Sequence, residues 1–185
     1  MKHIYTFLLV GILSTSTTIT FAQDSTNYLE LGLTQNKTGN YADALRNFSL
    51  EIEKNVANPN PISFYNRGFA KYNLKDFRVA FLDFDKAIEL KPTYFEAFIA
   101  RGQSYSKQEN HKVAIQDYNE AIRLNPLEAT AYFSRGISKS KLANYRGALS
   151  DYNKSLELNV EYAPGLAARG EAKAHLADYK GSIED

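Results

Sequence analysis

Hydrophobic positions along most of the chain follow the spacing of amphipathic helices, and these helices come in pairs. One apolar stretch runs from Ile62 to Leu74 and a second from Arg78 to Leu90. In both stretches apolar residues recur three or four positions apart, which is the period of one face of a helix. The same paired pattern returns further along the chain. It predicts an all-α protein built from helix–turn–helix units.

Five glycines mark the period of these units. They stand at positions 32, 68, 102, 136 and 170, so the last three intervals are 34 residues long and the first is 36. The two extra residues fall within residues 57–61, a loop-like segment where an insertion costs little. Units of this length stack into solenoids, because a single helical hairpin cannot bury its apolar face alone.

Further columns come into register when the units are aligned on the glycines. Twelve positions after each glycine comes a small residue: Ala44, Ala80, Ala114, Ala148 and Ser182. Four positions later comes an aromatic residue: Phe48, Phe84, Tyr118 and Tyr152. We expect the two helices of a unit to approach closely at the glycine and small-residue columns. The aromatic column is expected to fill the space between neighbouring units.

A short polar side chain precedes the second helix of every unit: Asn40, Asp76, Asn110, Asn144 and Asp178. Asparagine and aspartate side chains accept a backbone N–H at the start of a helix. The sequence therefore predicts an N-cap at each of these positions and a turn just before it.

An arginine and an aspartate vary together between units. The pairs are Arg67 with Asp83, Arg101 with Asp117, Arg135 with Asp151, and Arg169 with Asp185. The first unit lacks both partners, with Leu31 and Asn47 in their places. A guanidinium group suits a carboxylate, and a partly buried charge needs its partner. We therefore predict structural ion pairs, and we do not assign these arginines to ligand binding.

The 34-residue period, the small-residue columns and the closing prolines Pro92 and Pro126 resemble the tetratricopeptide repeat family. The resemblance divides the chain into a divergent first repeat at 25–60, repeats at 61–94, 95–128 and 129–162, and an incomplete fifth repeat at 163–185. It implies a right-handed superhelical solenoid. It also implies that the first helices line a concave face, and that peptides bind there.

The resemblance also places candidate peptide-binding residues on that face by repeat position. They are Leu29, Leu33, Lys37, Tyr65, Phe69, Tyr72, Asn73, Ile99, Gln103, Lys107, Phe133, Ile137 and Lys141. An aromatic cluster beside flexible lysines suits a peptide with hydrophobic and acidic residues. Packing between first helices is the alternative role, which we weigh equally for Leu29, Leu33 and Ile137.

Some members of the family clamp the C-terminal carboxylate of chaperone tails with lysine and asparagine side chains. The corresponding positions of the first unit hold Leu29 and Leu33, and only Asn66 fits the pattern. Starting one unit later places Tyr65 and Phe69 there instead. We therefore expect no such clamp.

The N-terminus has the three regions of a secretory signal. Lys2 precedes the apolar run from Ile4 to Leu13, and a Ser/Thr-rich stretch leads to Ala22. Ten apolar residues span about 15 Å as a helix, roughly half of a bilayer core. We therefore expect residues 1–22 to be a cleaved signal peptide, the mature protein to be periplasmic or secreted, and no stable membrane anchor.

Composition excludes several kinds of chemistry. The chain has no cysteine, and it carries 22 lysines and arginines against 21 acids. Removal of Lys2 with the signal leaves 21 of each, which is not the basic footprint of a nucleic-acid-binding protein. His111 occupies a column held elsewhere by Tyr41, Phe77 and Tyr145, so we interpret it as a packing residue. We expect no catalytic, metal or cofactor site.

The sequence favours an exported scaffold or adaptor that binds peptide segments of partner proteins of unknown identity. A second possibility is the sensory or scaffolding front part of a larger exported protein, such as an enzyme, truncated at residue 185. A third is self-association through the open C-terminal end of the array. A free-standing enzyme is the least favoured reading.

Overall fold

The computed structural model describes residues 27–160 and 163–184, which form nine α-helices and no strand. The predicted signal peptide at 1–22 lies outside the described residues. The helices are α1 (Tyr28–Lys37), α2 (Tyr41–Lys54), α3 (Pro61–Asn73), α4 (Phe77–Leu90), α5 (Phe95–Lys107), α6 (His111–Leu124), α7 (Ala129–Lys141), α8 (Tyr145–Leu158) and α9 (Ala163–Glu184). The all-α prediction is confirmed.

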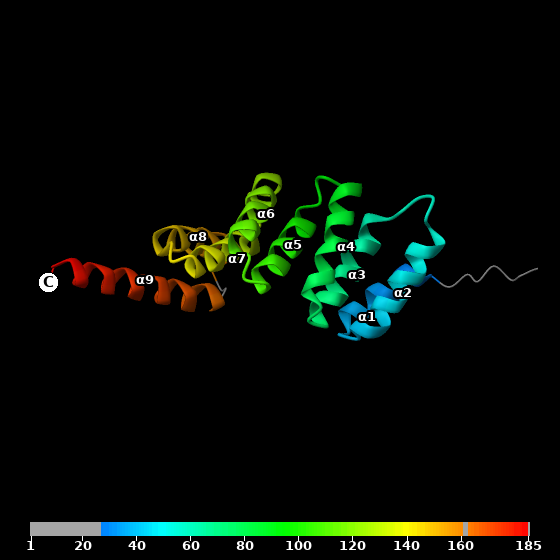
Figure 1. The fold of residues 1–185 in the computed structure, drawn as a ribbon, viewed down its shortest axis with the longest axis horizontal. Helices are drawn as coiled ribbons and strands as arrows, with labels where there is room; N and C mark the ends of the chain where they lie inside the picture. Colours follow the sequence, from blue (N-terminus) through cyan, green and yellow to red (C-terminus); the bar gives the residue numbers. More distant parts are fainter. Residues whose placement is uncertain (1–26, 161–162, 185) are drawn as a thin grey trace, which may run out of the picture.

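Consecutive helices pack as antiparallel hairpins that follow one another in a row (Figure 1). The first helices α1, α3, α5, α7 and α9 also contact one another in order along the array. Among the described residues no such contact joins α2 to α4, α4 to α6, or α6 to α8. The second helices therefore fan apart, and the array curves around the first helices. The result is a solenoid whose inner face is built from α1, α3, α5 and α7.

The close approach of the two helices in each hairpin rests on a glycine that lies against an aromatic ring. A Cβ atom added to Gly102 would come within 2.7 Å of Tyr118 Cε1, and one added to Gly136 within 2.6 Å of Tyr152 Cε1. Gly32 and Gly68 meet Phe48 and Phe84 in the same way. Ala44, Ala80, Ala114 and Ala148 are fully buried beside these rings. The predicted contact columns are confirmed in four units.

Each turn between the helices of a hairpin has one residue in the left-handed region. These residues are Gly39, Lys75, Glu109 and Ala143, with φ between 58° and 79°. The residue that follows donates its N–H to the carbonyl five positions earlier, as from Asn110 to Tyr105 at 3.0 Å. This bond closes the turn. A non-glycine residue in this region costs roughly 1–2 kcal/mol, which the packing of the following helix must offset.

The predicted N-cap positions are confirmed at Asn40, Asp76, Asn110 and Asn144, but the predicted side-chain bond forms only at Asn144. Asn144 Oδ1 accepts from the Gly147 N–H at 3.0 Å. The Asn40 side-chain amide donates instead to Asp43 Oδ2 at 2.7 Å. At Asp76 and Asn110 nothing in the structure explains the missing bond.

The Arg–Asp contacts are confirmed in three units and join the two helices of one hairpin. Arg101 donates from Nε and Nη2 to the two carboxylate oxygens of Asp117 at 3.0 and 2.6 Å. Arg67 with Asp83 and Arg135 with Asp151 repeat this bidentate geometry. The fourth predicted partner, Asp185, lies outside the described residues. Where the first unit lacks the pair, Asn47 donates instead to Gln35 at 2.6 Å.

The surroundings of the three aspartates differ in one respect. Lys71 and Lys139 each add an ion pair, at 2.8 Å from Asp83 and from Asp151. The corresponding residue in the third unit is Tyr105, so Asp117 has Arg101 alone. Burial raises the pKa of the Asp117 carboxyl, and the bonds from Arg101 oppose that rise only in part. The ionised Asp117 is therefore the least well compensated of the three.

The predicted turn at Asp178 is wrong, because α9 runs unbroken from Ala163 to Glu184. A turn here would place Ala177 in the left-handed region, whereas alanine is the best helix former. In the other units a second helix of fourteen residues packs on the first and offsets the cost of the turn. In α9 the chain continues as helix through this position.

The glycine–aromatic contact can be tested with a matched pair of substitutions. We expect Gly102→Ala to destabilise the fold by about 1–3 kcal/mol, because the added Cβ would lie 2.7 Å from Cε1 of the buried Tyr118 ring and force the two helices or the ring to shift. Gly170 lies in α9 with nothing within 4 Å of an added Cβ. Gly170→Ala should stabilise the protein by roughly 0.5–1 kcal/mol through helix propensity. Urea unfolding followed by circular dichroism measures both, and equal effects would contradict the assignment.

The raised pKa of Asp117 gives its removal a defined pH dependence. A raised folded-state pKa gives stability that is present at low pH and is lost as the pH rises through it. Asp117→Asn should therefore destabilise the fold more near pH 4 than at pH 7, in urea unfolding at both values. Asp83→Asn leaves both Arg67 and Lys71 without their carboxylate partner, so it should lower the free energy of unfolding by about 3–5 kcal/mol at pH 7. This loss should be larger than the loss caused by Asp117→Asn at the same pH. A larger Asp117→Asn cost at pH 7 than near pH 4 would refute this account.

Candidate functional site

Most of the predicted groove residues line two neighbouring cavities on the inner face of the solenoid. One cavity is lined by Tyr65, Phe69, Ile99 and Gln103, among other residues. The other includes Tyr72, Gln103, Lys107, Phe133, Ile137 and Lys141. Gln103 belongs to both walls, so the cavities adjoin along α5. These residues come from α3, α5 and α7, whose contacts define the inner face.

The remaining predicted groove residues lie outside these two cavities. Leu29 packs against the buried cluster that contains Phe48. Leu33 and Lys37 are exposed on α1. Asn73 donates its side-chain amide to the Phe69 carbonyl at 2.8 Å. The candidate site is therefore centred on the third and fourth units.

The aromatic side chains of the second unit pack mainly against other rings. Tyr65 lies 5.0 Å from Tyr94 and 5.8 Å from Phe84 between ring centroids. Burial, and then the nearby Glu96, raises the pKa of Tyr65. Phe69 makes an edge contact with Tyr41 from the preceding unit. Replacing Tyr65 and Phe69 would therefore disturb the core, and other residues are better probes of binding.

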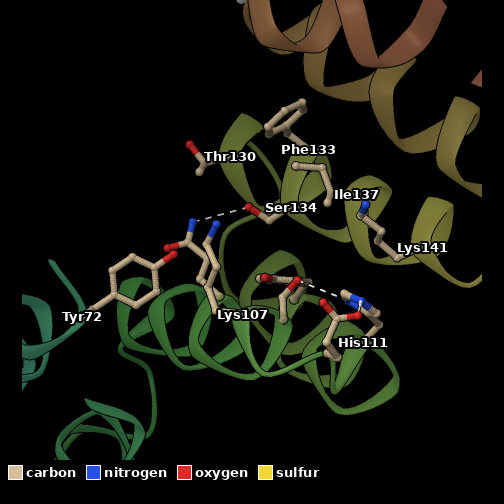
Figure 2. A pocket seen from close by; sticks show the side chains of 12 residues that line it. Tyr72, Lys107, His111, Thr130, Phe133, Ser134, Ile137 and Lys141 are labelled. Carbon is tan, nitrogen blue, oxygen red and sulfur yellow. Dashed lines mark hydrogen bonds and ion pairs between the residues drawn. The ribbon is translucent and has the colours of Figure 1, made fainter. Parts of the chain in front are cut away.

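The central cavity lies between α5 and α7 and has a volume of about 340 Å³ (Figure 2). Phe133 and Ile137 provide an apolar part of its wall, and Tyr72 borders it from α3. A second cavity of about 440 Å³ follows between α7 and α9 and shares Phe133, Ile137 and Lys141. The two cavities together run along both sides of α7, so a groove crosses the inner face at this helix.

Polar side chains bridge α5 and α7 beneath the central cavity. Gln103 Nε2 donates to Ser134 Oγ at 3.5 Å, and Ser138 Oγ lies 3.4 Å from Ser106 Oγ. Ser106 Oγ in turn lies 3.3 Å from His111 Nδ1 at the start of α6. Figure 2 shows the Gln103–Ser134 bond and the contact at His111 as dashed lines. The cavity therefore presents hydrogen-bonding groups at its base.

Tyrosine hydroxyls replace phenylalanine beneath this part of the groove. Tyr118 lines the central cavity and Tyr152 lines the next one, whereas the first two units have Phe48 and Phe84. Burial raises the pKa of Tyr118, and it raises that of Tyr152 to about 12. Both hydroxyls stay protonated at physiological pH, so both can donate a hydrogen bond to a ligand.

Some of the cationic side chains near the groove form ion pairs within the protein, and others do not. Arg101 and Arg135 are committed to Asp117 and Asp151. Lys107 and Lys141 are exposed at the ends of α5 and α7, and neither makes an ion pair with any residue in the described ranges. The ammonium groups on the cavity wall are therefore the cations that a ligand can use.

Sequence reasoning missed the hydroxyl-bearing side chains of the site: Ser106, Thr130, Ser134 and Tyr118. A signal for them was present in the repeat columns. The aromatic column changes from phenylalanine to tyrosine in the third unit, where serine also enters neighbouring columns. A hydroxyl on a ring that is otherwise fully buried needs a polar partner. The change to tyrosine together with the added serines was therefore a sequence signal for a polar cavity at this place.

The described part of the chain holds neither a metal-binding cluster nor a membrane-spanning helix. Residues 27–160 and 163–184 bring together no group of three or more His, Asp or Glu side chains that could hold a metal ion. None of the described helices combines the length and the apolar character needed to cross a membrane.

Comparison with known proteins identifies the repeat type. The sequence profile of the tetratricopeptide repeat family matches residues 62–94 and residues 95–127. No curated protein matches the sequence.

Solved structures share the fold. MamA from Desulfovibrio magneticus RS-1, residues 41 to the end, superposes with a TM-score of 0.71 and 24% identity, covering 85% of this chain and 88% of that one. YrrB, described as a TPR protein with an unusual peptide-binding site, superposes with a TM-score of 0.69 and 20% identity. The match covers 77% of this chain and 73% of YrrB. The first TPR of Spaghetti (RPAP3), bound to the HSP90 peptide SRMEEVD, superposes with a TM-score of 0.62 and 22% identity. The match covers 63% of this chain and 93% of that domain.

The repeat period, the glycine–aromatic contacts, the matched profiles and the shared fold agree. This chain contains tetratricopeptide repeats and folds as a tetratricopeptide-repeat solenoid.

Proposed function

We propose that the protein is an exported, non-catalytic scaffold that binds peptide segments of partner proteins in the groove along α5, α7 and α9. The observation that carries this proposal is the wall around α7. Phe133 and Ile137 are only partly buried there, and Lys141 has no ion-pair partner among the described residues. Half-exposed apolar side chains beside an unpaired cation suit an extended peptide with both apolar and acidic residues.

Peptide binding by proteins of the same fold supports this use of the groove. The Spaghetti (RPAP3) domain was solved with an HSP90 peptide, and YrrB is described by its peptide-binding site. The partner of the present chain differs in chemistry from a chaperone tail held by a C-terminal clamp, because Leu29 and Leu33 stand where clamp side chains would be.

Export is supported by the N-terminal sequence. Residues 1–22 combine a charged start, an apolar run too short for a stable anchor, and a small residue at the exit. The absence of cysteine leaves the folding of the chain independent of the redox state of its compartment. We place the mature protein in the periplasm or outside the cell.

Blocking the groove should abolish peptide binding without loss of fold. Thr130 is exposed and lines the central cavity, so Thr130→Trp would fill the groove from its rim. Gln116→Trp places the same side chain at an exposed position of α6 and serves as the control. Peptides selected from a displayed random library against the full chain should bind the wild type and Gln116→Trp equally in fluorescence polarisation. Binding to Thr130→Trp should be weaker by about tenfold or more.

Both variants should keep the circular dichroism spectrum of the wild type. Selection of no peptide by the folded wild type would refute peptide binding. Unchanged affinity of Thr130→Trp would instead place the binding surface elsewhere on the molecule.

Export can be tested on the same chain with a C-terminal affinity tag. Expressed in a bacterium, it should be recovered from the periplasm or the medium with an intact mass that begins at Gln23. Leu9→Arg interrupts the apolar run and should leave the full-length chain inside the cell. Recovery of the wild-type chain from the cytosol with Met1 or Lys2 as its first residue would contradict the proposal.

A further inference from the structure

His111 differs from every other member of its repeat column. The equivalent positions hold Tyr41, Phe77, Tyr145 and Tyr179. The His111 side chain is buried, with 8% of the residue exposed, and it forms part of the wall of the central cavity. A phenyl ring would satisfy the packing at this position, so the two nitrogens of the imidazole call for a separate explanation.

One of these nitrogens is satisfied and the other is not. Nδ1 lies 3.3 Å from Ser106 Oγ. Nε2 is buried and has no hydrogen-bond partner among the described residues. The nearest acid is Glu109, whose Oε2 lies 3.7 Å away and whose side chain is 90% exposed. That distance is too long for a hydrogen bond, so Nε2 lies buried and unpaired beside the cavity, an arrangement that costs free energy. A ligand atom reaches it only when a neighbouring side chain, such as the exposed Glu109, moves aside.

The contact with Ser106 is compatible with either tautomer of His111. Ser106 Oγ lies 3.3 Å from Nδ1 and can donate to it or accept from it. In the tautomer in which Ser106 donates, a neutral imidazole carries its proton on Nε2. An acceptor placed at Nε2 selects this tautomer.

Two cations border the same cavity. Lys107 extends from α5 and Lys141 from α7, with His111 below them in the view of Figure 2. Neither lysine makes an ion pair with a residue that the structure describes, whereas the neighbouring Arg101 and Arg135 are held by aspartates. Against these two positive charges the wall contains one carboxylate, Glu109. The cavity is therefore suited to an anion that also accepts hydrogen bonds.

We propose that the cavity between α5 and α7 is a subsite for an aspartate or glutamate side chain of the bound peptide, whose carboxylate accepts from His111 Nε2 between Lys107 and Lys141. This inference rests on the proposed function and adds the chemistry of the ligand. The apolar wall formed by Phe133 and Ile137 then takes a neighbouring hydrophobic residue of the same peptide. Glu109 acts as a competitor, since its own carboxylate is the internal acceptor closest to Nε2.

The subsite can be tested with the library of random peptides displayed on phage. Each peptide is fused to the coat protein through its carboxyl end, so that only side chains offer a carboxylate. We expect the peptides selected by the full chain to be enriched in aspartate or glutamate. The best of them is then synthesised with an amidated C-terminus, in parallel with a version in which glutamine or asparagine replaces the acid. Removal of the charge should weaken binding about tenfold or more in fluorescence polarisation.

Substitutions in the protein should follow the same logic. His111→Phe restores the ring type of the repeat column, so the fold is kept while the donor is lost. Lys107→Met and Lys141→Met keep the aliphatic stems and remove the charges. All three should weaken binding of the acidic peptide and leave the glutamine or asparagine version nearly unchanged. Glu109→Gln should strengthen binding of the acidic peptide. Lys112→Met, at an exposed position next to His111, is the matched control and should have no effect.

The outcomes separate the two proposals. Selected peptides without acidic enrichment, or acidic peptides that bind His111→Phe and Lys141→Met as tightly as the wild type, overturn the subsite and leave peptide binding standing. Selection of no peptide at all refutes the proposed function and the subsite with it. A synthetic peptide that binds only with a free C-terminus would assign the cavity to a terminal carboxylate, which also overturns the proposal.

Discussion

The contact between a glycine on the first helix and an aromatic ring on the second sets the geometry of every complete hairpin in this protein. Because Gly68, Gly102 and Gly136 have no side chain, the aromatic ring of the second helix packs directly on the backbone of the first. This close approach brings the neighbouring Arg–Asp partners within bidentate reach and allows a left-handed residue to close the turn. A Cβ atom at one glycine would therefore disturb packing, ion pair and turn together.

The same contact decides which side chains remain for binding. The ion pairs within the hairpins use the arginines, and the aromatic column fills the layer between first and second helices. What remains on the inner face is the C-terminal part of each first helix, with Lys107 and Lys141 exposed there and apolar residues beside them. Since the first helices contact one another while the second helices fan apart, these ends gather along one groove. The structural contacts and the proposed binding groove thus lie on different faces of one helix.

Features that repeat could be predicted from the sequence, and features that belong to one unit could not. The glycine columns and the Arg–Asp pairs were visible because four units supply independent copies of the same constraint. The side-chain cap bonds expected at Asn40, Asp76 and Asn110 do not form, because residue type alone does not decide which partner a side chain takes; Asn40, for example, donates to Asp43. Tyr65 was predicted as a groove residue by its repeat position. Its contacts with Phe84 and Tyr94 depend on rings from α4 and from the residue before α5, which its own position does not reveal.

The third unit departs from both of its neighbours at two polar positions, and these departures have a physical meaning. In a solenoid each unit contacts only its neighbours, so a unit that keeps its contact columns can change its remaining residues at little cost to the array. The third unit keeps Gly102, Ala114 and Tyr118 in those columns. It has Tyr105 where its neighbours have a lysine and His111 where they have an aromatic ring. The first change leaves the ionised Asp117 poorly compensated, and the second leaves Nε2 unpaired. An unpaired Nε2 is costly for a unit that only has to stack. It is explained if that unit holds a ligand whose carboxylate completes the hydrogen bonding of His111, whereas a further anion does not compensate Asp117.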